Sequence, residues 1–181
     1  MNLSSNAFTK TERRILDFFF ENPEREVFEK EVRKLAVVSA GSANSCLKTL
    51  YKKTYLLHRK LGRMNFYKLN SEDSFVKQLK KAYTLSLPVI SKIKEAFKNQ
   101  NIEVYLYGSA ARGEDTEKSD IDLLIIGNIE AVELEKNLTR IKIMSKKEIK
   151  PSLFRKLDWI SVSKKDPAFF ERVQKDKIRI V

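Results

Sequence analysis

The chain has 181 residues, of which 42% are hydrophobic and 33% charged, and its formal net charge is +12. This composition indicates a folded protein of one or two domains, and the apolar runs are too short to cross a membrane. One cysteine, Cys46, and one histidine, His58, exclude an internal disulfide and a Cys/His zinc cluster, so carboxylates would have to hold any metal ion. The first residues lack the apolar core of a signal peptide, and we therefore expect a cytoplasmic protein with no membrane partner.

The positive charge is concentrated in one stretch of the chain. Residues 1–31 contain seven acids and five bases, whereas residues 32–71 contain nine bases and no Asp or Glu. Solvated protein surfaces normally mix both signs of charge. The stretch therefore favours a nucleic-acid-binding surface, with DNA as the expected partner, over a basic surface that binds nothing.

Residues 9–69 have the pattern of three helices and a hairpin. Thr9 and Glu12 form a capping-box pattern that opens a helix to about residue 20. A second helix is predicted at about 27–35, and a third follows a turn at 37–42 and runs to about residue 53. The strand-like runs 56–60 and 66–69, joined by LGRMN, predict a hairpin with a basic tip.

This order of elements resembles a winged helix-turn-helix domain over about residues 8–70, and we assign residues 1–70 to such a domain. In that family the third helix enters the major groove of DNA and the hairpin contacts the backbone or the minor groove. Short polar residues at the start of the helix would reach base edges and lysines would bind phosphates, although Ser42, Asn44 and Ser45 fit capping and solvation equally well. The matching positions are Ser42, Asn44, Ser45, Lys48, Thr49, Lys52 and Lys53 on the helix, and Arg59, Lys60 and Arg63 on the hairpin.

Residues 71–99 continue as a long connecting helix, with apolar residues at spacings of three and four. Pro88 interrupts this pattern and predicts either a kink or two helices that abut near Leu87. The apolar stripe would pack on its own domain or form the seam of a homodimer.

Residues 100–181 form the expected second domain, an α/β domain with a small mixed sheet, which makes the whole chain α+β. Strands are predicted at 102–107 and 120–126, and helices from residue 109 and at about 129–141. A third strand near 147–154 contains Pro151, which confines it to a sheet edge or to an irregular stretch. Residues 155–163 fit either a helix or a loop, and Asp166-Pro167 opens a terminal helix before an apolar end.

The stretch LYGSAARGEDTEKSDIDLLII, residues 106–126, contains the residues that suit catalysis. Gly108-Ser109 joins a strand to the start of a helix, where outward-pointing N–H groups suit a phosphate. Asp120 and Asp122 face the same way because side chains alternate along a strand. Since adjacent carboxylates repel unless a cation lies between them, the pair predicts a Mg²⁺ site facing the Gly108-Ser109 turn.

The pattern G-S-x-x-R-G, five residues and then S-D-I-D-L resembles the DNA polymerase β-like nucleotidyltransferase superfamily, in particular its minimal branch, over about residues 100–180. The resemblance implies that Asp120 and Asp122 bind Mg²⁺, two ions in an active enzyme, and that Gly108 and Ser109 hold the phosphates of ATP or another NTP. A nucleoside monophosphate would pass to a protein or nucleic-acid acceptor, and pyrophosphate would leave. Arg112 would bind phosphate or make a structural salt bridge. Ser119 would anchor the loop that orients Asp120.

The superfamily usually has a third carboxylate on a following strand, where this chain has Ile149-Lys150. Glu148 is our candidate for the third catalytic carboxylate, Asp158 is a more distant one, and the remaining alternative is that none exists. Two functions therefore stay open. One is a Mg²⁺-dependent nucleotidyltransferase directed to its target by a winged helix, and the other is a DNA-binding transcription regulator whose nucleotidyltransferase domain only binds nucleotide or is inactive.

Overall fold

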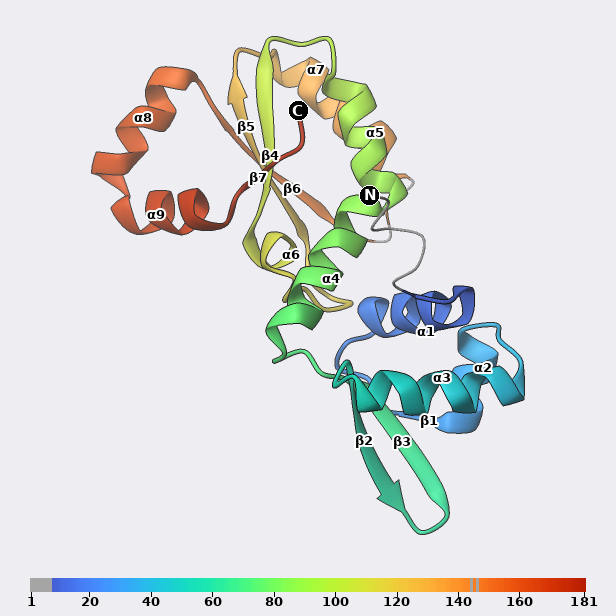
Figure 1. The fold of residues 1–181 in the computed structure, drawn as a ribbon. Helices are drawn as coiled ribbons and strands as arrows, with labels where there is room; N and C mark the ends of the chain where they lie inside the picture. The colour runs from blue at the N-terminus through green and yellow to red at the C-terminus, as the bar shows by residue number, and fades with distance from the viewer. Residues whose placement is uncertain (1–7, 144, 146) are drawn as a thin grey trace, which may run out of the picture. The chain divides into compact units, whose positions relative to one another are not determined.

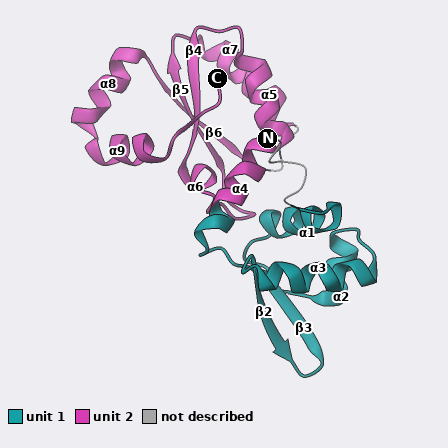
Figure 2. Ribbon diagram, in the orientation of Figure 1, with its two compact units in different colours: residues 1–77 teal, residues 78–181 magenta. Residues whose placement is uncertain are grey.

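The computed structural model describes residues 8–143, 145 and 147–181. The chain divides into two compact units, residues 1–77 and residues 78–181 (Figure 2). Within the described ranges, no helix is both long enough and apolar enough to cross a bilayer.

The described residues of unit 1 form the following helices and strands before α4 begins (Figure 1): α1 (Lys10–Glu21), α2 (Glu29–Leu35), α3 (Ala40–Lys52), β1 (Val27–Phe28), β2 (Leu56–Leu61) and β3 (Met64–Leu69). The predicted capping box is confirmed, because the Glu12 N–H donates to Thr9 Oγ1 at 3.2 Å and the Thr9 N–H donates to Glu12 Oε2 at 2.8 Å. The hairpin is also confirmed. Strands β2 and β3 pair antiparallel from Leu56↔Leu69 to Leu61↔Met64.

The second helix begins two residues later than its predicted start at residue 27, because Val27 and Phe28 form strand β1 and pair with Tyr67 and Phe66 of β3. A β-branched residue and an aromatic residue suit such a strand. The three strands form an antiparallel sheet in the order β1-β3-β2. Buried residues of the helices and of this sheet make the core of the unit, among them Ile15, Leu16, Phe19, Leu47, Leu50, Leu56, Tyr67 and Leu69.

Two helices, not one, occupy the connecting region: α4 (Ser74–Ser86) and α5 (Pro88–Phe97). Leu87 has extended backbone angles, φ −63° and ψ 143°, and Pro88 is at the start of α5. A proline disfavours helical angles in the residue before it, and at the first helical position it lacks only an N–H that would have no partner. Ile90, Ile93 and Phe97 are fully buried in the core of unit 2, so this half of the predicted stripe packs on its own unit.

The sheet of unit 2 has the strand order β6-β5-β4-β7, made of β4 (Ile102–Tyr107), β5 (Ile121–Gly127), β6 (Ile149–Phe154) and β7 (Ile178–Arg179). Strands β5 and β6 are parallel, whereas β4 is antiparallel to both β5 and β7. The sheet is therefore mixed, as expected. Pro151 lies in the edge strand β6, where a missing N–H leaves no central ladder bond unmade. After α5, the helices of unit 2 are α6 (Gly108–Arg112), α7 (Ala131–Lys142), α8 (Lys156–Lys165) and α9 (Pro167–Asp176).

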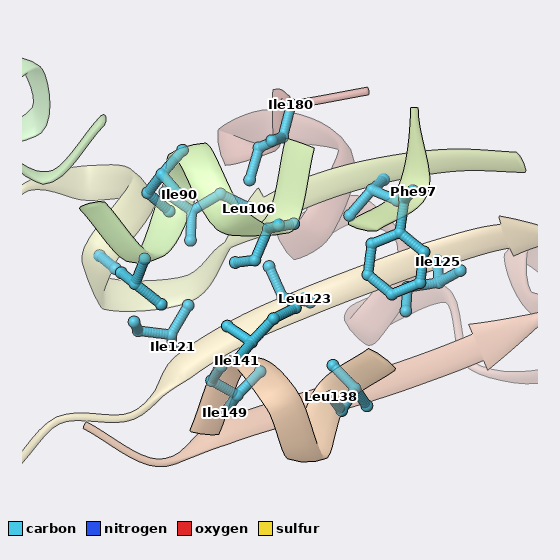
Figure 3. Packing of buried hydrophobic residues seen from close by; sticks show 14 of the residues in the cluster. Ile90, Phe97, Leu106, Ile121, Leu123, Ile125, Leu138, Ile141, Ile149 and Ile180 are labelled. Carbon is cyan, nitrogen blue, oxygen red and sulfur yellow. The ribbon is translucent and has the colours of Figure 1, made fainter. Parts of the chain in front are cut away.

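Both faces of this sheet are covered by helices. On one face α5 and α7 bury Ile90, Phe97, Leu138 and Ile141 against the sheet, including Leu123 (Figure 3). On the other face α8 and α9 bring Trp159, Val162 and Val173 against Leu124 and Ile126. Burial on both faces explains why β5 is a continuous apolar run. It also fixes the position of the two aspartates where this strand begins.

Candidate nucleotide-binding site

Gly108 and Asp122 lie against each other at the ends of two paired strands. Tyr107, the last residue of β4, is opposite Asp122 of β5, and Gly108 follows directly. Gly108 has φ +73°, and a Cβ at this position would collide with the carboxylate of Asp122. The backbone conformation therefore favours glycine here, and any side chain at residue 108 would displace the Asp122 carboxylate.

Asp120 and Asp122 are partly buried and differ in their partners. Burial and the negative charge of Asp120 raise the pKa of Asp122 above its usual range, although Lys150, Arg112 and Arg172 act in the opposite direction. Asp120 Oδ2 is 2.6 Å from Lys150 Nζ. A cation between the carboxylates would relieve the repulsion that Asp122 experiences. Two carboxylates beside a turn with no room for a side chain fit a hard divalent cation such as Mg²⁺.

The structure brings Lys150 rather than a third carboxylate to this pair. Strand β6 places Lys150 directly opposite Asp122 on β5, so the two side chains are on the same face of the sheet. The hydrogen bond and the charge of Asp120 raise the pKa of Lys150. Among the residues that the structure describes, no three His, Cys, Asp or Glu side chains are grouped so that they could hold a metal ion.

Neither proposed third carboxylate joins the pair in such a group. The carbonyl oxygen of Glu148 accepts the N–H of Ile121 at 2.8 Å, while the Glu148 side chain is exposed. Asp158 is on α8 and lines a groove with Gly127 and Phe154, at the other end of β5. Strand β5 is seven residues long, so its two ends are roughly 20 Å apart, and Asp158 is too far from the two aspartates to share a metal ion with them.

The other two residues predicted at the site make structural contacts. Arg112 donates through Nε to Glu114 at 2.7 Å and through its Nη1 to Asp176 at 3.2 Å, so the salt-bridge alternative describes its arrangement here. Ser119 Oγ accepts the N–H of Thr116 at 2.9 Å and so closes the loop just before Asp120.

A buried charge cluster that the sequence did not predict holds the same loop. The Asp115 side chain is 7% exposed, and its carboxylate lies 2.9 Å from Lys80 Nζ and 2.5 Å from Lys147 Nζ. Lys80 Nζ also donates to the Asp115 carbonyl oxygen. The loop from α6 to β5 is thus fixed both to α4 and to the segment before β6. The sequence contained one indication that Lys80 is buried. Lys80 is four residues after Val76 and four residues before Thr84, which places the three on one face of a helix, and all three are buried.

In unit 1, the residues predicted to bind nucleic acid differ in their surroundings. Some already have partners: Ser42 pairs with the helix cap Ser39 at 2.8 Å, Lys53 lies 3.6 Å from Glu12, and Arg59 lies 2.6 Å from Glu26. Four are exposed cations, Lys48 and Lys52 on α3 and Lys60 and Arg63 around the tip of the hairpin. Thr49 Oγ1 donates to the Ser45 carbonyl oxygen at 3.1 Å within α3.

The first turn of α3 borders a hollow on the surface of unit 1. Asn44, Ser45 and Lys48 line it together with Arg33 of α2. Within the part of the chain that the structure describes, Asn44 Oδ1 is a buried oxygen without a hydrogen-bond partner.

Comparison with known proteins identifies the C-terminal half of the chain. A model of the family described as polymerase beta, nucleotidyltransferase matches residues 91–181. No curated protein matches the chain significantly. The matched segment includes the Gly108-Ser109 turn, both aspartates and Lys150, but Lys80 lies outside it.

Proposed function

The chain belongs to the polymerase beta nucleotidyltransferase family, and from this membership we propose that unit 2 binds a nucleoside triphosphate and transfers its nucleoside monophosphate to a hydroxyl acceptor. The observation that carries the proposal is the contact between the Gly108-Ser109 turn and Asp122, which leaves no room for a side chain at residue 108. A turn at the start of a helix beside two carboxylates suits a metal-bound polyphosphate.

The chemistry that we propose follows from the positions of these residues. Asp120 and Asp122 hold Mg²⁺, which when bound supplies positive charge to offset that of the triphosphate. Gly108 and Ser109 bind the β- and γ-phosphates. The acceptor oxygen forms a bond to the α-phosphorus, the bond from that phosphorus to the bridging oxygen breaks, and pyrophosphate leaves. The proton of the acceptor hydroxyl passes to water.

Unit 1 is proposed to act as a winged helix that binds nucleic acid, preferably DNA. Its three helices and hairpin follow the order expected of such a domain. The exposed cations Lys48, Lys52, Lys60 and Arg63 supply positive charge suited to phosphates. This unit would direct the transfer reaction to its target.

Lys150 favours a second candidate function, a DNA-binding regulator that binds nucleotide without transferring it. A lysine opposite Asp122 brings positive charge to a position where a further metal ligand would be negative. In this alternative, nucleotide bound to unit 2 acts as a signal and is not a substrate.

Labelled transfer assays on the full chain distinguish the two functions. The protein is incubated with α-³²P-labelled NTPs, Mg²⁺, and either protein or nucleic-acid acceptors. We expect label on an acceptor, and we expect Asp120→Asn or Asp122→Asn to lower transfer by about 100-fold or more, because each removes a charge that holds the metal. Glu117→Gln, a charge change at an exposed loop residue, serves as the matched control.

Three outcomes are informative. Transfer that survives both asparagine substitutions would contradict the proposed site. Nucleotide binding without transfer to any acceptor would favour the regulator. Neither binding nor transfer would contradict both functions.

A further inference from the structure

We infer that the Lys150 ammonium takes the place of a second divalent ion in the nucleotide site. Unit 2 then binds its NTP with one divalent ion and with this side chain. The inference rests on the proposed nucleotide site and specifies its cation content. It is carried by the contact of 2.6 Å between Lys150 Nζ and Asp120 Oδ2.

Backbone pairing fixes the base of the Lys150 side chain. Residues Ile149 to Phe154 pair in parallel register with residues Ile121 to Ile126, and Lys150 is opposite Asp122. The ammonium reaches the carboxylate of Asp120, the residue directly before β5. Lys150 is thus directed at both aspartates by the sheet and not by a mobile loop.

Exposure leaves the Lys150 ammonium able to contact a ligand. The Lys150 side chain is 57% exposed and that of Asp120 is 30% exposed. An ammonium has three donors, so Lys150 can keep its bond to Asp120 while it donates to a phosphate oxygen. A bound polyphosphate would therefore gain a charge-assisted hydrogen bond that needs no metal.

The local charge disfavours a second divalent ion. Asp120 and Asp122 supply two negative charges and Lys150 supplies one positive charge. These three side chains therefore carry a net charge of −1, which one divalent ion already outweighs. A second ion would have to lie beside an ammonium, which repels it, and the described residues supply no third acidic ligand to that group.

Two substitutions at residue 150 test the inference. Lys150→Asp places a carboxylate opposite Asp122, and Lys150→Met removes the charge while it keeps an unbranched side chain. Lys136→Met, at an exposed position of α7, is the matched control. The fluorescence of Trp159, a residue buried in the core of unit 2, verifies that each variant is folded.

Metal content and metal-free binding are measured separately on the full chain. Electron paramagnetic resonance counts Mn²⁺ bound per chain in the presence of α,β-methylene ATP, and calorimetry measures the affinity for the same analogue in EDTA. We expect one Mn²⁺ per chain for the wild type and for Lys150→Met, and two for Lys150→Asp. In EDTA, Lys150→Met should bind the analogue about fivefold more weakly than the wild type and Lys136→Met do.

The possible failures are distinguishable. If the wild type binds the analogue with two Mn²⁺, or if Lys150→Met binds it in EDTA as well as the wild type does, the inference is wrong while the nucleotide site stands. If the wild type does not bind the analogue even with Mn²⁺, the proposed nucleotide site is wrong and the inference falls with it.

Discussion

At Gly108, both the backbone conformation and the neighbouring carboxylate disfavour a side chain. Its positive φ disfavours any other residue, and the Asp122 carboxylate occupies the space that a Cβ would need. The closeness of the turn to the aspartate therefore depends on a missing side chain. Asp122 itself is partly buried beside Asp120, and both burial and that charge raise its pKa. A bound cation would lower it again.

Gly108→Ala should abolish nucleotide binding, because the added methyl group displaces the Asp122 carboxylate. The strained backbone should also destabilise unit 2 by about 1–2 kcal/mol. Calorimetric titration with an NTP analogue and thermal unfolding measure the two effects.

Gly41→Ala provides the matched control for this substitution. A Cβ at Gly41 meets nothing within 4 Å, and the residue is in helix α3. Alanine is the better helix former, so unit 1 should gain up to about 1 kcal/mol of stability and nucleotide binding should not change. Normal nucleotide binding by Gly108→Ala would show that the contact between turn and carboxylate is not needed.

At the scale of elements, the loop between α6 and β5 is held by Asp115. The carboxylate accepts a charge-assisted hydrogen bond from Lys147, which precedes β6, and forms an ion pair with Lys80 of α4. Burial raises the pKa of Asp115, but the hydrogen bond from Lys147 and the charge of Lys80 outweigh it, so the pKa lies below its usual range. Three segments distant in sequence thus share one buried negative charge near the start of β5.

Asp115→Asn should lower the free energy of unfolding of unit 2 by about 3 kcal/mol at neutral pH, since it leaves two lysines without their buried counter-charge. A carboxyl with a lowered pKa in the folded state stabilises the protein above its unfolded pKa of about 3.9, and that stability is lost as the pH falls through the folded value. The difference between wild type and Asp115→Asn should therefore shrink below about pH 4.

Urea unfolding followed by Trp159 fluorescence measures this difference across pH. The control for Asp115→Asn is Glu117→Gln, because Glu117 is exposed. Asp166→Asn would be a less suitable control, because Asp166 caps helix α9. Equal stability of Asp115→Asn and wild type at neutral pH would show that the cluster contributes nothing.

At the scale of the whole molecule, the net charge of +12 is the property most relevant to a polyanionic partner. The acid-free stretch of residues 32–71 lies entirely in unit 1. Not all of its cations are equally available. Arg59 donates to Glu26 through two nitrogens, at 3.0 and 2.6 Å, whereas Lys60 and Arg63 are exposed near the tip of the hairpin.

Lys60→Ala and Arg63→Ala should each weaken DNA binding and reduce the slope of log affinity against log salt by about 0.9, because each removes one phosphate contact. Arg59→Ala should have the smaller effect, since its guanidinium is engaged by Glu26. Fluorescence anisotropy of a labelled duplex over a series of salt concentrations measures both quantities, with Lys136→Ala in unit 2 as the control. Unchanged affinity and slope in all hairpin variants would rule out this surface as the DNA contact.

The sequence by itself determined the features that depend on neighbouring residues. Capping chemistry placed the start of α1, Pro88 ended one helix and began another, and the apolar run from Ile121 to Gly127 placed strand β5. These features follow from local geometry and from hydrophobic periodicity, which act over a few residues. The motif around the Gly108-Ser109 turn and the membership of the family are of the same kind, because they depend on spacing along the chain.

Only the tertiary structure decided which residues meet across long separations. The parallel register of β5 and β6 put Lys150 opposite Asp122, and it left the Glu148 side chain exposed. Lys80 and Asp115 are 35 residues apart in sequence, and the short strand β1 formed only because β3 offered it a partner. Strand register and the burial of charges depend on the packing of the whole unit, and a shift of one residue would exchange the two faces of a strand. The fold, and not the sequence motif, therefore determines which cations lie near the two aspartates.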